Sequence, residues 1–261
     1  MTDDTPGLAA KDVPSALMRQ TLLDRDLVKP IERPVIRLLP WLNVITLGGR
    51  SIIDRGRDVV LPVVDELRSL LPEHRMLILT GAGIRARHVL GVGLDLGLPT
   101  GALAGLAATE AEQNGHLIAA LLAADGVSYL PSASVAHQLA VHLAASPAVV
   151  SNGFPPYGIY EFPPAVGKIP PHRTDVGAFL LADAYGASRA IYVKDVDMDL
   201  ERVSVAEVVD KDLEIPVDRL VLELMADAKH VKEIQIVNGL TQGNITQALR
   251  GEPGGTTVYS D

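Results

Sequence analysis

Cysteine is absent from this chain of 261 residues, and aromatic residues make up only 4% of it. The lack of thiols excludes disulfides, iron–sulfur clusters and thiolate metal sites. Because hydrophobic residues still account for 48% of the sequence, the core must be built from alanine and the aliphatic residues. That composition is typical of buried parallel strands covered by helices.

Long apolar runs and an excess of basic charge are also missing. No stretch is apolar enough to span a bilayer, and residues 1–20 lack the apolar segment of a signal peptide. The net charge of −9 disfavours a nucleic-acid-binding surface, which would need to be basic. We therefore expect a soluble, cytoplasmic protein with no nucleic-acid partner and no membrane partner.

The sequence divides into two regions that differ in their hydrophobic pattern. Residues 1–35 are polar and contain four prolines, which predicts an N-terminal arm that either wraps a neighbouring subunit or frays. Over residues 36–261, short apolar runs alternate with helical periodicity. This alternation predicts an α/β fold, a three-layer α/β/α sandwich with a mostly parallel central sheet. The expected strands are 43–47, 76–80, 127–130, 147–151, 190–194, 233–237 and 256–259, and the expected helices are 54–71, 103–124, 174–186 and 216–230.

One segment interrupts the alternation. Residues 152–172 contain six prolines and four of the ten aromatic residues of the chain. Long loops of this kind are usually functional, as a lid or as an interface. Since exposed aromatic side chains are costly in water, we favour a subunit contact.

Glycine turns and helix starts follow three of the predicted strands. Ligands of parallel sheets bind at the carboxyl ends of the strands, and a helix N-terminus attracts anions through its unpaired N–H groups. Arginines add bidentate donors. The pattern predicts a site for a tetrahedral anion or a nucleotide phosphate, although the glycines could also serve only to make tight turns. The candidate residues are Gly48, Gly49, Arg50, Gly81, Gly83, Arg85, Arg87, Thr174 as a helix cap and Asp175 as an organiser.

Several of these segments resemble a known family. The stretches LGGR, TGAGIRARHVLGVGLDLGLP, RTDVGAFLLADAYGA, IQIVNGL and LRGEPGGTTV are similar to the amino-acid kinase superfamily, in its uridylate kinase-like branch. Within that branch the sequence resembles the molybdenum storage family, most of all its α-type subunit. The resemblance implies a hexameric cage that uses ATP to pack molybdate or tungstate into oxide clusters.

Two departures from the family concern ATP. The family has a lysine where this chain has Thr46, and a lysine there neutralises charge on phosphate oxygens. After the fifth strand, Asp197 matches a family aspartate, but Met198 replaces the following glycine and the nucleotide loop is missing. We therefore expect weak or absent binding of ATP and Mg²⁺, and we do not expect kinase activity.

Other candidate ligands come from histidines and acidic residues. The α-type subunit has consecutive histidines at its clusters where this chain has residues 158–160, GIY. His142 matches a family histidine near the cluster cavity, with a core or interface histidine as the alternative. His172 is the second candidate cluster ligand. Asp195 and Asp197 are possible Mg²⁺ ligands if they alternate along a strand, with a solvated strand end as the alternative.

The predicted function is storage or sequestration of molybdate or tungstate, as a nutrient reservoir. The chain would be one subunit of a homo- or hetero-oligomer, expected to be a hexamer with a related subunit. Two alternatives stay open at this point. One is a non-catalytic scaffold or regulatory subunit, and the other, less favoured, is an active nucleotide-dependent kinase.

Overall fold

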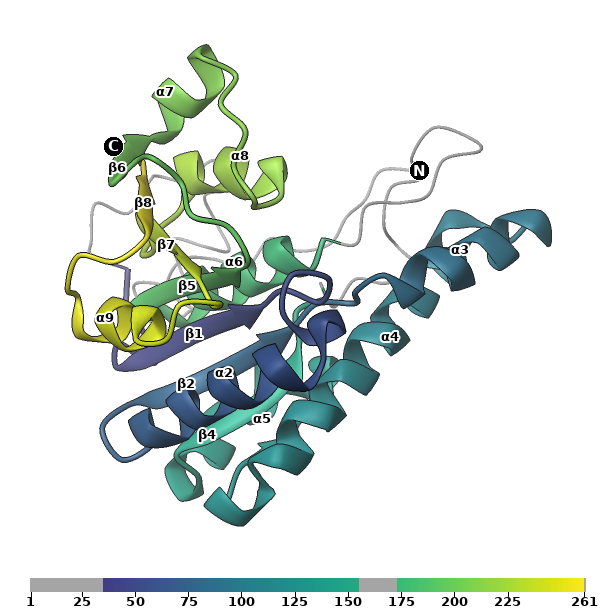
Figure 1. Cartoon of the computed structure of the whole chain (residues 1–261), viewed down its shortest axis with the longest axis horizontal. Helices are drawn as coiled ribbons and strands as arrows, with labels where there is room; N and C mark the ends of the chain where they lie inside the picture. Colours follow the sequence, from purple (N-terminus) through teal and green to yellow (C-terminus); the bar gives the residue numbers. More distant parts are fainter. Residues whose placement is uncertain (1–34, 155–172, 261) are drawn as a thin grey trace, which may run out of the picture. The chain divides into compact units, whose positions relative to one another are not determined.

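The described part of the chain forms one large sheet flanked by helices (Figure 1). A computed structural model describes residues 35–154 and 173–260. The predicted arm and most of the segment 152–172 therefore lie outside the described residues, and the boundary at residue 35 stays a prediction.

Eight strands are found among the described residues, in the order β3-β4-β2-β1-β5-β7-β8-β6. Every neighbouring pair is parallel except β7 and β8, which are antiparallel. The strands are β1 (Leu42–Leu47), β2 (Arg75–Thr80), β3 (Ser128–Tyr129), β4 (Ala148–Asn152), β5 (Arg189–Lys194), β6 (Arg202–Ser204), β7 (Glu233–Asn238) and β8 (Thr256–Tyr259).

Helices cover both faces of this sheet, which confirms the three-layer sandwich. One face packs against α2, α4 and α9, and the other packs against α5, α6 and α8. None of the described helices is long and apolar enough to cross a membrane. The helices are α2 (Arg57–Leu70), α3 (Arg85–Asp95), α4 (Thr100–Leu121), α5 (Ser132–Ala145), α6 (Thr174–Tyr185), α7 (Val205–Asp210), α8 (Arg219–Asp227) and α9 (Asn244–Arg250), with 3₁₀ turns η2 (Ile53–Arg55) and η3 (Ala123–Asp125).

The central position of β1 follows from its sequence. All six residues from Leu42 to Leu47 are buried, as expected for a strand covered on both faces. Each of the seven predicted strands is present, and no end is shifted by more than one residue. The sequence pattern did not predict β6, α7 and α9, because elements of three to seven residues are too short to show a period. The expected helices also lacked α5, although it has 14 residues, and included only the start of α3.

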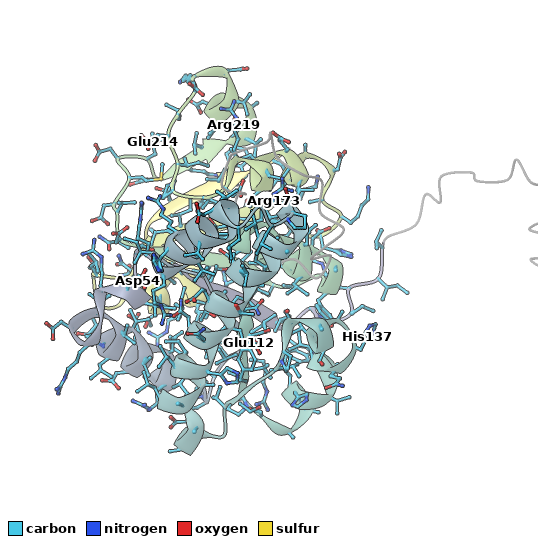
Figure 2. The ribbon with its side chains drawn as sticks, turned by 90° about the vertical axis from the view of Figure 1, so that its right-hand side faces the viewer. Asp54, Glu112, His137, Arg173, Glu214 and Arg219 are labelled. Carbon is cyan, nitrogen blue, oxygen red and sulfur yellow. The ribbon has the colours of Figure 1, made fainter. Side chains whose placement is uncertain are left out.

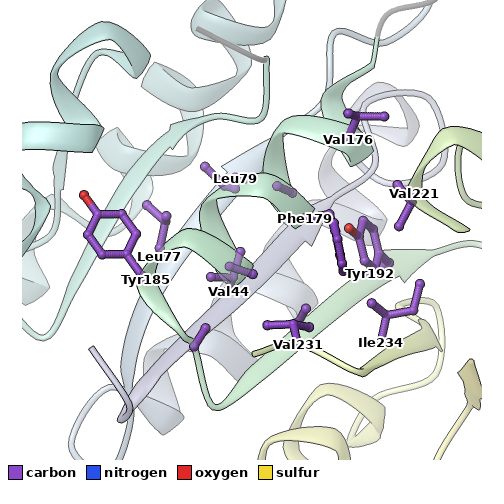
Figure 3. Close-up of a cluster of buried hydrophobic side chains, with 14 of the residues drawn as sticks. Val44, Leu77, Leu79, Val176, Phe179, Tyr185, Tyr192, Val221, Val231 and Ile234 are labelled. Atoms are coloured by element: carbon purple, nitrogen blue, oxygen red, sulfur yellow. The ribbon is translucent and has the colours of Figure 1, made fainter. Parts of the chain in front are cut away.

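The core between the sheet and α6 is aliphatic apart from a few rings, among them Phe179 and Tyr192 (Figure 3). Tyr192 on β5 is fully buried, and its hydroxyl donates a hydrogen bond of 2.9 Å to the backbone carbonyl of Asp175. Burial, followed by the negative charges of Asp175 and Asp218, raises the pKa of Tyr192 well above its ordinary value. The phenol therefore stays neutral and ties the start of α6 to the sheet.

Asp183 makes the corresponding tie at the other end of α6. Its carboxylate accepts hydrogen bonds from the backbone N–H groups of Lys229, His230 and Val231 at 2.7–3.1 Å. Burial by itself would raise the pKa of Asp183, but these donors outweigh it and lower the pKa. The charged carboxylate therefore fixes the connection between α8 and β7.

The Asp183→Asn substitution should lower the free energy of unfolding by about 1–3 kcal/mol at neutral pH, because the amide keeps only one accepting oxygen. A depressed pKa in the folded state stabilises the protein above the unfolded value near 3.9, and this contribution disappears as the pH falls through the folded value. Urea unfolding should therefore show the gap between wild type and variant closing in acid. Asp227→Asn, at an exposed position on α8, is the matched control and should change little. An equal gap at all pH values would contradict the assignment.

Candidate anion-binding site

The carboxyl ends of β1, β2 and β5 meet at a cavity of about 420 Å³. This volume lies in the range of small-molecule sites. Four predicted segments contribute to its wall, as expected for a parallel sheet. The predicted site residues that line it are Gly48, Gly49, Arg50, Gly81, Gly83, Arg87, Thr174, Asp175 and Asp195.

The loops after β1 and β2 touch through their backbones. A Cβ atom built on Gly49 would lie 2.2 Å from the nitrogen of Gly83 and 2.7 Å from the carbonyl oxygen of Gly81. Gly83 also has φ of +79°, a conformation that favours glycine. The two loops approach each other so closely that a side chain at Gly49 would overlap the backbone of Gly81 and Gly83. Without side chains, the glycines expose their backbone groups in the cavity wall.

Arg85 was expected to join this wall, but it is not among the lining residues. Its guanidinium donates a hydrogen bond to the side-chain oxygen of Asn114 and lies 3.5 Å from the carboxylate of Glu110, both on α4. Successive helical residues are about 100° apart, so Arg85 and Arg87 point to different sides of α3. Direct contact of Arg85 with a bound anion is therefore not supported.

Thr174 lines the cavity but does not cap its helix. It is the first residue of α6, and Arg173 occupies the N-cap position with φ of +50° and no side-chain cap bond. The predicted capping role of Thr174 is therefore wrong. Arg173 also lines the cavity but was not among the predicted residues, although an arginine directly before a helix start at the ligand edge is a usable signal.

A buried ion pair forms one side of the cavity. The ammonium of Lys194 at the end of β5 lies 2.9 and 2.8 Å from the two carboxylate oxygens of Asp175. Only 11% of the lysine side chain and 13% of the aspartate side chain are exposed. The same carboxylate accepts the N–H of Asp218 at 3.2 Å. These contacts agree with an organising role for Asp175, which connects α6, β5 and the start of α8.

Lys194 lies on the strand next to Thr46, the position of β1 at which the family resemblance predicts a lysine. Thr46 is 1% exposed and lies in register with Tyr192 of β5. Lys194 follows Tyr192 by two residues and therefore projects from the same face of the sheet. Strand β5 thus places a lysine on the same face of the sheet as Thr46, but this lysine is already paired with Asp175.

Two other cations of the wall are uncommitted. Arg50 and Arg87 are exposed, and neither makes an ion pair or side-chain hydrogen bond within the described residues. Counting charged lining residues gives four cations and three carboxylates, a net charge of +1. They are Arg50, Arg87, Arg173 and Lys194 against Asp175, Asp195 and Asp218. Because the Asp175 and Asp195 carboxylates are already paired, the wall offers positive charge to an incoming anion.

The acidic pair expected to hold Mg²⁺ is arranged differently. Strand β5 ends at Lys194, so Asp195 and Asp197 do not alternate along a strand as predicted. Asp195 pairs with Arg55, and Asp197 accepts a hydrogen bond of 2.7 Å from the amide of Asn238. Across residues 35–154 and 173–260, no group of three or more histidine, aspartate or glutamate residues is placed to hold a metal ion.

Of the two candidate cluster histidines, only His142 belongs to the described residues, and it does not join the cavity. His142 lies in the last turn of α5 and is not among the lining residues. Figure 2 shows His137, on the same helix, at the right of the view, whereas Asp54, in the turn η2 that follows β1, lies at the left. His172 and the segment 158–160 lie outside the described residues, so these predictions stay untested.

A short turn after the first glycine loop is bonded to two residues of the cavity wall, Ile84 and Asp195. The carboxylate of Asp54 in η2 accepts the backbone N–H of Ile84, at the start of α3, at 2.5 Å. Its neighbour Arg55 pairs with Asp195. The N–H of the N-cap residue of α3 is therefore bonded to a side chain of the protein itself, a contact that no local sequence pattern predicted.

The Gly49→Ala substitution should lower the free energy of unfolding by about 1–3 kcal/mol or more, because the added methyl group overlaps the backbone of the next loop. The change should also abolish anion binding at this edge. Gly91→Ala is the control, since Gly91 lies exposed on α3 with no atom near the added Cβ. The control should be neutral or stabilising by about 0.5–1 kcal/mol. Equal melting temperatures for the two variants in calorimetry would contradict the close-approach argument.

Comparison with known proteins agrees with this geometry. The amino acid kinase family model matches residues 41–207. The molybdenum storage protein subunit beta of Azotobacter vinelandii is 41% identical, and the match covers 93% of this chain and 95% of that protein. This relative is a β subunit, so the predicted α-type assignment is not confirmed.

Solved structures of uridylate kinases share the fold. The enzyme from Archaeoglobus fulgidus superposes with a TM-score of 0.63 at 18% identity, covering 83% of this chain and 99% of that one. The UMP kinase of Bacillus anthracis gives 0.62 at 16% identity, covering 87% and 97%. The sequence match, the sheet order and the glycine loops together show that this chain belongs to the amino acid kinase family.

Proposed function

We propose that this chain is a subunit of a molybdenum storage assembly and that its strand-end cavity binds molybdate or tungstate. The proposal is supported by the cavity wall, where glycine backbones meet Arg50 and Arg87, two cations that have no partner across residues 35–154 and 173–260. Molybdate is a tetrahedral dianion like phosphate, so a wall suited to phosphate oxygens also suits it. Arginines and backbone N–H groups bind such ions through oxygen, without metal–ligand bonds.

The storage relative supplies the rest of the proposal. Its name as a subunit implies an assembly of more than one chain, and 41% identity over nearly the full length makes a similar role for this chain the best-supported one. We propose a cytoplasmic reservoir, a hexamer with a related subunit, that holds the oxyanions as oxide clusters.

ATP is expected to play a weak part in this subunit. Thr46 is buried and uncharged, and Lys194 is paired with Asp175, so neither β1 nor β5 offers a free cation to a transferred phosphate. Only residues 195–201 connect β5 to β6, which leaves no room for the nucleotide loop of the family. These features favour storage over phosphoryl transfer.

Calorimetry with Mg-ATP should show no tight binding by the wild-type chain. Thr46→Lys should not restore it, because the short connection between β5 and β6 still lacks the contacts to base and ribose. Micromolar binding with turnover by the wild type would support the kinase alternative, and recovery in the variant would mean that the lysine alone was missing.

Elemental analysis tests the storage proposal directly. Protein purified from cells grown with molybdate or tungstate should carry many metal atoms per chain, whereas a metal-free oligomer would favour the scaffold alternative. Arg87→Gln should weaken tungstate binding by about tenfold to a hundredfold in calorimetry, since it removes a charge-assisted contact.

Arg250→Gln is the matched control for this experiment. Arg250 is exposed at the end of α9 and is not among the lining residues of the cavity. The same loss of charge there should leave the affinity for tungstate within about twofold of wild type. Equal weakening by both substitutions would indicate a general charge effect and count against the cavity.

A further inference from the structure

Asn114 lies behind the anion cavity rather than in it. It projects from the middle of α4, is 0% exposed and is not among the lining residues. Its amide nitrogen donates hydrogen bonds to the carbonyl oxygens of Gly81 at 2.7 Å and Ala82 at 3.2 Å. The side chain therefore holds two successive peptide groups of the glycine turn after β2.

These two bonds fix where the N–H groups of the turn point. In a trans peptide the C=O and N–H groups point in opposite directions, and the described residues contain no cis peptide. Drawing the carbonyls of Gly81 and Ala82 toward α4 turns the N–H groups of Ala82 and Gly83 away from α4. Both residues belong to the cavity wall.

Neither N–H group has a hydrogen-bond acceptor within the part of the chain that the structure describes. Among the hydrogen bonds of the described residues, none is donated by the nitrogen of Ala82 or Gly83. Free backbone donors in a wall that also carries Arg87 are suited to the oxygens of an anion. The hydrogen bonds from Asn114 therefore set the direction in which these N–H groups point.

Arg85 completes the arrangement from the other side. Its guanidinium donates to the amide oxygen of Asn114, which leaves the amide nitrogen facing the two carbonyls and fixes which way the amide is turned. Glu110 lies 3.5 Å from the same guanidinium. This gives Arg85 a role that its position outside the wall would not otherwise explain.

We infer that Asn114, held by Arg85, is a positioning residue that aims the N–H groups of Ala82 and Gly83 at a bound tetrahedral oxyanion. The inference rests on the proposed function, since it names the donors of the same cavity. The amide supplies two N–H donors, which a carboxylate of the same shape lacks. An aspartate at this position would set its oxygens against the two carbonyl oxygens, and the turn would lose its orientation.

The test is tungstate binding to the full-length chain carrying Asn114→Asp. We expect affinity in calorimetry to fall by at least about tenfold, the cost of losing one or two charge-assisted contacts. Gln113→Glu is the matched control, since it makes the same amide-to-carboxylate change at the next, exposed position of α4. The control should bind within about twofold of wild type.

Hydrogen exchange separates positioning from simple loosening. In wild type and in the control, tungstate should slow amide exchange in the peptide that spans residues 79–86. In Asn114→Asp this anion-dependent protection should be lost even at saturating tungstate, whereas a merely structural role would leave it intact once the anion is bound. Wild-type affinity or wild-type protection in Asn114→Asp would overturn the inference.

Arg85→Met provides a second variant in case the aspartate variant does not fold. It should weaken tungstate binding severalfold, and combining it with Asn114→Asp should add no further loss if Arg85 acts through Asn114. Fully additive losses would instead place Arg85 at the anion itself and contradict the inference. Failure of the wild type and the control to bind tungstate at all would overturn the proposed function together with this inference.

Discussion

The contact between two backbone loops determines the shape of the ligand edge. Gly49, after β1, approaches the turn Gly81–Gly83, after β2, so closely that no side chain fits between them. Because β1 and β2 are parallel neighbours, their carboxyl ends have to emerge side by side, and the glycines allow the two chains to turn without blocking the edge. The cavity, its backbone donors and the position of α3 all follow from this approach.

Electrostatics then determines what that edge can do. The buried pair of Lys194 and Asp175 fixes the position of α6 against β5 and offers no free charge to a ligand. Removing either partner would leave the other as an unpaired buried charge, which is costly. Arg50 and Arg87, which are exposed and unpaired within the described residues, supply the charge available to a ligand. Under the proposed storage function, such a wall holds an anion, and the buried, neutral Thr46 of β1 adds no charge to it.

The interior polar contacts show how the helices are tied to the ligand edge. Tyr192 and Asp175 connect the start of α6 to β5, and Asn114 connects α4 to the turn after β2. Each of these hydrogen bonds joins a helix of the outer layers to a strand or to the turn that follows it. A small shift of a helix would therefore move residues of the cavity wall. The aliphatic core supplies bulk stability, while these few hydrogen bonds specify the geometry.

The sequence by itself determined the layers, the parallel sheet and the glycine turns, because hydrophobic periodicity and glycine placement are local properties of the chain. It also identified nine of the eighteen residues that line the cavity, since parallel strands bring their carboxyl ends to one edge, but not the segment 215–218 before α8. Only the tertiary structure decided which charged residues share that edge. Arg85 turns to Asn114, Asp195 pairs with Arg55, and Asp54 occupies the start of α3. Such pairings join residues far apart in sequence, and no local pattern encodes which partner a long charged side chain will meet.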